Sequence, residues 1–255
     1  MFPYIGITDF TNFEQVQEIL RIFEVYQPHE SNRKLHVGVM MSYKTLNELP
    51  NKWQQVFPPK ETVADIFSSE ETYNCLHYVD YENNPQLEKN IFRAICFGGQ
   101  GIRALQLDMI WPDPTELKNG IKAFCADIEI ILQIGRNAFE DINDKPEQLA
   151  ERLEKYQGVI QRVLLDKSMG RGLGMDAESL IPFVMMIRKK FPTLGIGAAG
   201  GLGPETLQLV KPLVKVLPEI SIDAQGRLRP SGNALDPIDW NMAKRYIIEA
   251  HKLFN

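Results

Sequence analysis

The chain has 255 residues, of which 44% are hydrophobic and 24% are charged, the composition of an ordinary globular protein. Its formal net charge is −5 and it contains no basic run, which argues against a general nucleic-acid surface or an anionic membrane as partner. The first residues lack the basic segment and long apolar stretch of a secretory signal or membrane helix. We therefore expect a cytoplasmic protein that binds neither nucleic acid nor membrane.

The cysteines and histidines predict neither disulfides nor a metal site. Cys75, Cys96 and Cys125 each lie in an apolar or strand-like stretch without the spacing of a metal-binding pair. Buried, reduced thiols are the expected outcome, which agrees with a reducing compartment. The four histidines are scattered along the chain without paired spacing. We therefore predict no metal and no cofactor.

Short apolar segments recur along the chain and alternate with segments of helical periodicity. This alternation is typical of parallel β/α organisation. Eight strand candidates are present, and an eight-stranded barrel of about 250 residues would use the whole chain. We therefore predict a single domain over residues 1–255, an α/β protein of the (β/α)8 TIM-barrel class. The predicted strands lie near residues 4–8, 35–41, 75–79, 104–109, 129–133, 160–165, 195–199 and 219–223.

Helix starts are marked at several of the intervening segments. Thr11 and Glu14 have the spacing of a capping box, and Asp176 precedes an apolar helical stripe. Pro204 suits the first position of a helix after the seventh strand, and residues 236–239, which include Pro237, open the last helix in the same manner. The apolar stripes of these helices are predicted to form the core.

Residues 42–73 are the least regular part of the chain and predict an enlarged loop after the second strand. Pro50, Pro58 and Pro59 interrupt the pattern, and Trp53 and Phe57 stand among polar residues. In a barrel this loop lies at the catalytic face, because it follows the carboxyl end of a strand. Two interpretations remain open, a lid over the ligand and an irregular docking segment.

Three glycine turns follow the sixth, seventh and eighth predicted strands, at residues 164–174, 196–205 and 220–229. Glycine allows close approach of the backbone to a ligand, and a following helix offers unpaired N–H groups to an anion. Arg171, Arg227 and Arg229 in these turns can each add a bidentate contact. The turns therefore predict a small phosphorylated metabolite as ligand.

The strand ends and glycine turns resemble those of phosphoribosylanthranilate isomerase, a member of the ribulose-phosphate-binding barrel superfamily. The similar stretches occur in the right order over most of the chain, at residues 6–8, 38–44, 105–107, 164–166, 199–202 and 222–226. The resemblance implies a catalytic aspartate at Asp166. It also implies phosphate binding by the last two stretches, at Gly200, Gly201, Leu202, Ala224, Gln225 and Gly226.

Two departures from that family bear on the activity. The family carries its general base, a cysteine, just before the Gly-Ile-Thr stretch, where this chain has Ile5. It carries a substrate-binding arginine where this chain has Asn47. The resemblance therefore implies the fold and the phosphate grip without the catalytic cysteine, and it argues against the ordinary activity of the family.

Polar residues at the carboxyl ends of barrel strands converge on one site, and this chain has several carboxylates there, Asp223 among them. Asp166 follows an apolar run that can raise its pKa toward useful acid/base work, and Asp108 can replace the missing cysteine as second partner. Lys44 can compensate the charge of an enolate-like intermediate. A helix cap at Asp166 and a structural role for Asp108 are the alternatives.

The predicted function is an isomerase that acts on a phosphorylated sugar or related metabolite. The loop after Asp166 is expected to contribute substrate contacts from Gly170, Arg171 and Gly172, joined by Arg227. One alternative is a carbon–carbon lyase or aldolase that forms a Schiff base on Lys44 or Lys167. Another, motivated by Ile5, is a barrel that binds a phosphorylated metabolite or a partner without catalysis. The sequence predicts no particular oligomeric state.

Overall fold

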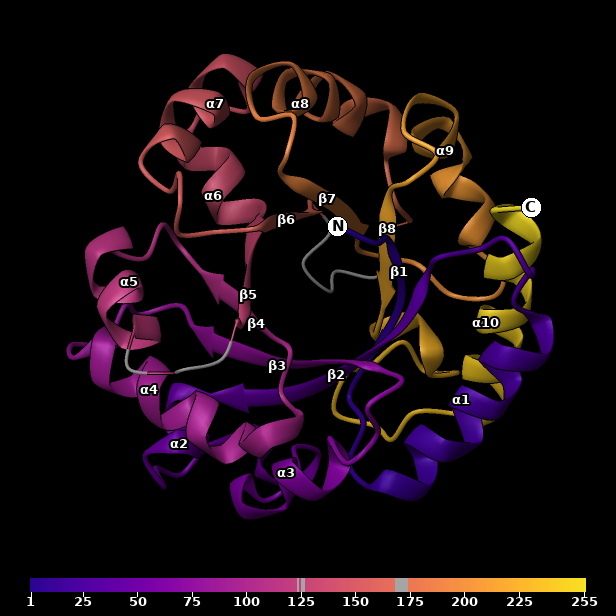
Figure 1. Ribbon diagram of the computed structural model, residues 1–255, viewed down its shortest axis with the longest axis horizontal. Helices are drawn as coiled ribbons and strands as arrows, with labels where there is room; N and C mark the ends of the chain where they lie inside the picture. Colours follow the sequence, from indigo (N-terminus) through magenta and orange to yellow (C-terminus); the bar gives the residue numbers. More distant parts are fainter. Residues whose placement is uncertain (123, 125–126, 168–173) are drawn as a thin grey trace.

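The computed structural model describes residues 1–122, 124, 127–167 and 174–255. Its strands pair in parallel and in chain order, and β8 pairs with β1, so the sheet closes into an eight-stranded barrel (Figure 1). The predicted (β/α)8 barrel is confirmed. The strands are β1 (Tyr4–Thr8), β2 (Lys34–Ser42), β3 (Tyr73–Asp80), β4 (Ala104–Met109), β5 (Glu129–Gly135), β6 (Arg162–Asp166), β7 (Gly195–Ala199) and β8 (Ser221–Ala224).

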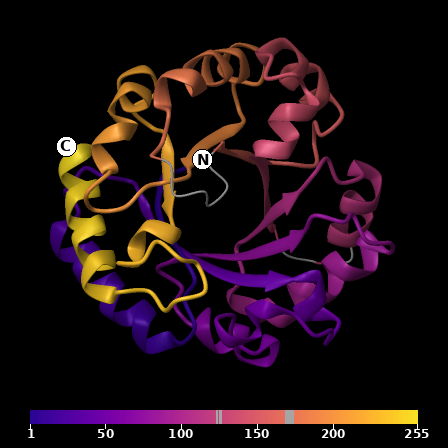
Figure 2. The ribbon, with the colours of Figure 1, turned by 180° about the vertical axis from the view of Figure 1, so that it is seen from behind.

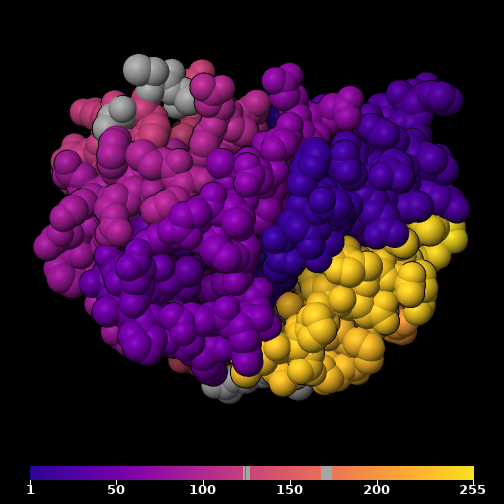
Figure 3. Space-filling view, turned by 90° about the horizontal axis from the view of Figure 1, so that it is seen from below, coloured from indigo at the N-terminus to yellow at the C-terminus, as the bar shows by residue number. Residues whose placement is uncertain are grey.

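Helices surround the barrel in both views down the ring (Figures 1 and 2). The first helix and the last lie side by side on the surface, where Figure 3 shows the indigo and yellow segments in contact. The α-helices are α1 (Phe13–Tyr26), α2 (Tyr43–Leu46), α3 (Val63–Ile66), α4 (Leu87–Gly98), α5 (Pro114–Lys122), α6 (Arg136–Asp141), α7 (Pro146–Glu154), α8 (Ala177–Lys190), α9 (Lys211–Val216) and α10 (Trp240–Leu253). Short 3-10 helices are η1 (Lys52–Gln55), η2 (Lys60–Thr62), η3 (Gly99–Gly101), η4 (Leu207–Val210) and η5 (Gly226–Leu228).

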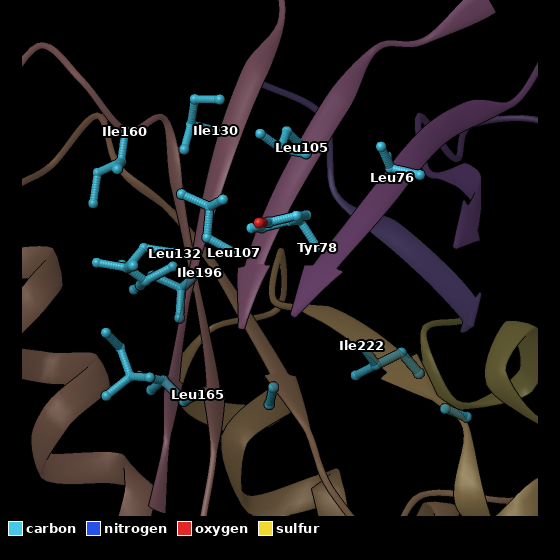
Figure 4. Close-up of a cluster of buried hydrophobic side chains, with 14 of the residues drawn as sticks. Leu76, Tyr78, Leu105, Leu107, Ile130, Leu132, Ile160, Leu165, Ile196 and Ile222 are labelled. Atoms are coloured by element: carbon cyan, nitrogen blue, oxygen red, sulfur yellow. The ribbon is translucent and has the colours of Figure 1, made fainter. Parts of the chain in front are cut away.

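Alternate residues of each strand face the barrel axis and the helices, because side chains change sides at every residue of a strand. The outward-facing residues form the main core with the helices, and Leu107 and Leu132, paired across β4 and β5, belong to it (Figure 4). A second buried cluster fills the barrel interior. Its members are Tyr4, Tyr73, Cys75, Ala104, Ile131, Leu164 and Ala199.

Arg162 fills the amino-terminal end of the barrel interior. Its side chain is 2% exposed, and its guanidinium donates to Ser221 Oγ over 3.1 Å and to the carbonyl of Phe2 over 3.0 Å. The guanidinium carbon also lies 5.0 Å from the ring centroid of Tyr4 and 5.8 Å from that of Tyr73. These contacts close the end of the barrel opposite the carboxyl ends of the strands.

The structure corrects several predicted helix starts. The capping box of α1 is formed by Asn12 and Gln15 instead of Thr11 and Glu14, because the Asn12 side chain accepts from the Gln15 N–H over 3.0 Å. No helix begins at Pro204, since a turn and then η4 precede α9. Two further starts concern aspartates. Asp176 caps α8, ahead of the predicted stripe, and Asp239, the last residue of the predicted opening stretch 236–239, caps α10.

Of the cysteines, Cys75 is buried in the barrel interior, as predicted. Cys96 is exposed on α4, so the prediction that it is buried is wrong. Cys125 lies outside the described residues. Among the described helices, none is both long and apolar enough to span a membrane.

The irregular segment after β2 is closed on itself by one contact and held to α4, outside the barrel, by two others. Lys60 is buried and its Nζ lies 2.5 Å from Glu48 Oε1. Arg93 on α4 donates to Asn47 Oδ1 over 2.7 Å and to the carbonyl of Leu46 over 3.0 Å. These anchors hold the intervening residues, which include η1, beside the carboxyl-terminal mouth of the barrel.

Candidate functional site

A cavity of about 370 Å³ opens at the carboxyl ends of the strands. Residues at the ends of β2 to β8 line it, together with residues of the loops that follow β2, β3, β7 and β8. Its size suits a small metabolite, and the carboxyl-terminal face is where barrel folds place their ligands. The polar groups of this cavity define the candidate site.

Asp108 stands on the β4 wall of the cavity in a nearly dry setting. It is 7% exposed, and its Oδ2 accepts a hydrogen bond of 2.5 Å from the hydroxyl of Tyr81. Burial raises the pKa of Asp108 to about 7, with a smaller rise from the charge of Asp166, while the Tyr81 hydrogen bond acts in the opposite direction. Asp108 therefore changes its protonation state near neutral pH.

His77, Gln106 and Gln133 form a polar row beside Asp108. Gln106 Nε2 donates to Gln133 Oε1 over 2.8 Å and lies 3.2 Å from Nε2 of His77, whose Nε2 is 3.9 Å from Asp108 Oδ2. Burial lowers the pKa of His77 to about 4, so the imidazole is neutral at pH 7. The β3–β5 wall thus presents amides and an uncharged imidazole next to a titratable carboxyl.

Asp223, one residue before the end of β8, lines the same cavity with a second titratable carboxyl. It is 5% exposed, its Oδ2 accepts from Thr8 Oγ1 over 2.8 Å, and its Oδ1 lies 3.7 Å from His36 Nδ1. Burial raises the pKa of Asp223 to about 7, and the charges of Asp9 and Asp166 raise it further, against the Thr8 hydrogen bond. No lysine or arginine of the described chain pairs with this carboxyl.

Asp166 lies at the end of β6 and lines the cavity together with Asp108 and Asp223. Its negative charge raises the pKa values of both, so it lies within electrostatic reach of each. The two carboxylates that the sequence selected, Asp166 and Asp108, therefore meet in one cavity. Asp223 was recognised only as a polar residue at a strand end, and its place in the site follows from closure of the barrel.

The glycine turns after β7 and β8 also reach the cavity. Gly200 and Gly201 line it with φ angles of 99° and 69°, a backbone that glycine adopts without strain. Leu202 and Gly226 line it too, as does Arg227. The turn after β7 is not followed directly by a helix, since η4 begins only at residue 207. The helix N-terminus expected behind this turn is therefore absent from this part of the described chain.

Two neighbouring residues of the β8 turn have other surroundings than predicted. Ala224 packs in the outer core, because alternation turns its side chain away from the axis. Gln225 lines the cavity, but its amide Nε2 donates to both carboxylate oxygens of Asp9, over 3.2 and 3.1 Å. Ala224 is therefore not part of the cavity lining, and the Gln225 amide nitrogen is already engaged.

Arg229 is buried beneath the site and not available to a ligand. Its guanidinium donates to Asp9 Oδ2 over 2.5 Å, to the carbonyl of Gln225 over 2.9 Å and to the carbonyl of Asp236 over 2.5 Å. These bonds brace the loop after β8, which carries Arg227 into the cavity lining. The predicted contacts of Gly170, Arg171 and Gly172 lie outside the described residues.

Neither predicted lysine lines the cavity. Lys44 is half-exposed on α2, because Ser42 caps this short helix and turns the chain outward, and its Nζ lies 3.9 Å from Glu82 Oε1. Lys167 pairs with Asp144 over 2.7 Å and lies over the ring of Phe183. Lys44 is therefore corrected from a member of the catalytic group to a surface residue.

The position of Ile5 bears on what the absence of a cysteine there implies for catalysis. Ile5 is fully buried in the outer core, between the barrel and the helices, whereas Thr8 of the same strand reaches Asp223 at the cavity. Because side chains alternate along a strand, a cysteine at position 5 would not face the cavity either. The carboxyls on other strands supply the titratable groups of the site.

Trp53 and Phe57 from the segment after β2 complete one side of the cavity. Their rings are stacked, with centroids 5.6 Å apart and planes at 8°. The segment therefore contributes an aromatic wall, although its anchors lie on the outside of the barrel. Among the described residues, no group of three or more potential ligands could hold a metal ion.

Comparison with known proteins supports the fold. No family model and no curated protein matches the chain. A structure described as spore coat polysaccharide biosynthesis protein E from Chromobacterium violaceum matches over 98% of this chain and 75% of its own, with a TM-score of 0.60 and 11% identity. At such identity the likeness concerns the fold alone.

Two other structures match at lower TM-scores. An orotidine 5'-monophosphate decarboxylase from Methanocaldococcus jannaschii matches over 98% of both chains, with a TM-score of 0.49 and 9% identity. A protein described as a mandelate racemase/muconate lactonizing enzyme from Sorangium cellulosum matches over 88% of this chain and 53% of its own, with a TM-score of 0.46 and 13% identity.

Proposed function

We propose that this chain is an enzyme that transfers a proton within a small phosphorylated sugar or related metabolite, an isomerase that uses aspartate acid/base chemistry. The observation that carries the proposal is Asp108, a buried carboxyl at the cavity with a pKa of about 7. An acid or base works best when its pKa lies near the working pH. Asp108 can therefore take and give a proton at neutral pH.

Removal of a proton from a carbon next to a carbonyl group places negative charge on the carbonyl oxygen. Hydrogen-bond donors that are already in place stabilise such charge most effectively. The neutral imidazole of His77 and the amides of Gln106 and Gln133 line the cavity beside Asp108 and can supply them. This group takes the role that the sequence gave to Lys44, and the charge of Asp166 contributes to the raised pKa of Asp108.

The glycine turns after β7 and β8 can bind a phosphate group on the side of the cavity that faces Asp108. Gly200 and Gly201 bring backbone to the cavity without side chains in the way, and Gly226 does so from the next loop. Arg227 adds a cationic side chain to the same lining. An anionic group placed here leaves the carbon skeleton of the ligand near the carboxyls.

The proposal is tested by hydrogen exchange. Sugar phosphates and the corresponding free sugars are incubated with the protein in deuterated buffer, and loss of the C–H signal next to the carbonyl is followed by proton NMR. We expect exchange with at least one phosphorylated sugar and not with its free form. Asp108→Asn should slow it by about 100-fold or more, the usual contribution of a general acid or base.

Asp80→Asn is the matched control. Asp80 also ends a strand, but its carboxylate accepts from the backbone N–H and side-chain amide of Asn84, over 3.0 and 2.8 Å, and does not line the cavity. Exchange that persists unchanged in Asp108→Asn, or that is absent with every sugar phosphate, would contradict the proposal.

No observation favours the two alternatives. The described lining of the cavity contains no lysine, so the Schiff-base route of an aldolase lacks its nucleophile there. The non-catalytic alternative was motivated by Ile5, which packs away from the cavity.

A further inference from the structure

We propose that Asp108 and Asp223 act on opposite faces of the bound metabolite, so that the enzyme inverts a stereocentre next to a carbonyl group. This inference rests on the proposed function and names the class of reaction. The substrate class is a phosphorylated sugar with a chiral carbon beside its carbonyl.

The order of the strands supplies the geometry. In a closed barrel of eight strands in chain order, β4 and β8 are four strands apart in either direction and therefore form opposite walls. Asp108 belongs to β4 and Asp223 to β8, and both line the cavity. A ligand that occupies this cavity therefore lies between the two carboxyls.

Asp223 lacks the contacts of a structural aspartate. Asp9 provides the comparison, because it is buried to a similar extent and is held by the guanidinium of Arg229 and the amide of Gln225. Asp223 has no such cation, and its Oδ1 has no hydrogen-bond partner although it is buried. A buried carboxyl without a counter-charge tends to bind a proton.

The surroundings of Asp223 make the proton it holds available for transfer. His36, 3.7 Å from Oδ1, has a pKa lowered to about 3 by burial, so it stays neutral and does not compete as a cation. Thr8 fixes the other oxygen. The pKa of Asp223, like that of Asp108, lies at about 7, so near neutral pH one carboxyl can be ionised while the other is protonated.

The proton transfers balance without any further reactant. The Asp108 carboxylate removes the proton from the chiral carbon, and the C–H electron pair moves toward the carbonyl, whose oxygen becomes the enolate oxygen. The Asp223 carboxylic acid then donates its proton to the opposite face of that carbon, and the enolate pair forms the new C–H bond. Asp108 is left protonated and Asp223 ionised, and exchange with water restores the starting state. The reverse reaction exchanges the two roles.

The test uses the wild-type protein and two variants, Asp108→Asn and Asp223→Asn, in deuterated buffer. The substrates are 2-keto pentose 5-phosphates and 2-keto hexose 6-phosphates, each in both configurations at the carbon next to the carbonyl. For the wild type we expect early product that is inverted and deuterated, while the remaining substrate still carries protium. This result does not depend on whether the variants fold.

The variants assign the two faces. Each should lose interconversion by about 100-fold or more, yet each should still exchange the hydrogen of one epimer, and the two variants should retain opposite epimers. Asp80→Asn serves again as control, and thermal unfolding verifies that the variants are folded.

The outcomes separate the two proposals. If the wild type exchanges no hydrogen with any sugar phosphate, the proposed function fails and the inference with it. If the wild type exchanges hydrogen without inversion, or if Asp223→Asn behaves as the wild type, the inference is wrong and the proposed function stands.

Discussion

The buried ion pair between Arg229 and Asp9 provides a quantitative test of how the loop after β8 is held. The two side chains are 1% and 6% exposed, and Arg229 Nη2 lies 2.5 Å from Asp9 Oδ2. Replacing Arg229 by Met leaves the Asp9 carboxylate buried without its counter-charge and removes the donors to two backbone carbonyls. Breaking a buried pair from one side destabilises a protein by about 3–5 kcal/mol.

The expected shift in melting temperature follows from the size of the chain. For a domain of this length, 1 kcal/mol corresponds to about 2 °C, so Arg229→Met should lower Tm by about 6–10 °C. The matched control is Arg245→Met. Arg245 Nη2 also lies 2.5 Å from a carboxylate oxygen, that of Glu205, but the two side chains are 59% and 57% exposed. This variant should change the stability by no more than about 0.5 kcal/mol.

Urea and thermal unfolding of both variants measure the difference. Because protonated Asp9 needs no counter-charge, the deficit of Arg229→Met should shrink as the pH falls, whereas Arg245→Met should stay near the wild type. Equal small effects in both variants, or a deficit that does not shrink with acid, would refute the reasoning from burial.

Three further outcomes are expected. Gly6→Ala should lower the unfolding free energy by about 1–3 kcal/mol and also slow proton exchange with the substrate, because the added Cβ would lie 2.5 Å from Asp223 Oδ1 and displace that carboxyl. Denaturant unfolding measures the first effect and the NMR exchange assay the second. Trp53→Ala should raise KM about tenfold with little change in kcat, because the Trp53 ring lines the cavity but carries no group that transfers a proton. Steady-state kinetics measure both constants, and a fall in kcat at saturating substrate would disprove this. Asp108→Asn should become more stable than the wild type as pH rises from about 4 to about 7. The pKa of Asp108 is about 7 in the folded protein and has its ordinary value of 3.8 in the unfolded chain, so the unfolding free energy of the wild type falls as pH rises between these values, whereas that of the variant lacks this fall. A difference in unfolding free energy that stays constant over this pH range would contradict the assignment.

The barrel could be predicted from the sequence because apolar strand segments and helical stripes alternate eight times, and three strands occupy the predicted residues. The same reasoning selected Asp108 and Asp166, which both line the cavity, because each follows a leucine near the end of a strand and strand ends converge in a barrel. The positions of the Lys44 and Ile5 side chains could not be predicted. Each depends on a local detail, the end of β2 at Ser42 and the side of β1 that a residue faces.

Other parts of the site depend on closure of the sheet. Asp223 becomes a partner of Asp108 only when β8 pairs with β1 and thereby stands opposite β4. Trp53 lines the cavity within a segment that Arg93 of α4 holds at Asn47, a contact between residues 46 positions apart in the chain. Periodicity and spacing carry no information about such contacts.

The Arg162 contacts at the amino-terminal end of the barrel have a kinetic consequence. With the guanidinium held by Ser221 and the Phe2 carbonyl, the axis is blocked at that end, and a ligand reaches the carboxyls from the carboxyl-terminal mouth. Substrate and product then use the same opening and the same cavity. Product has to leave through the opening by which substrate enters, so accumulated product competes directly with substrate for the cavity.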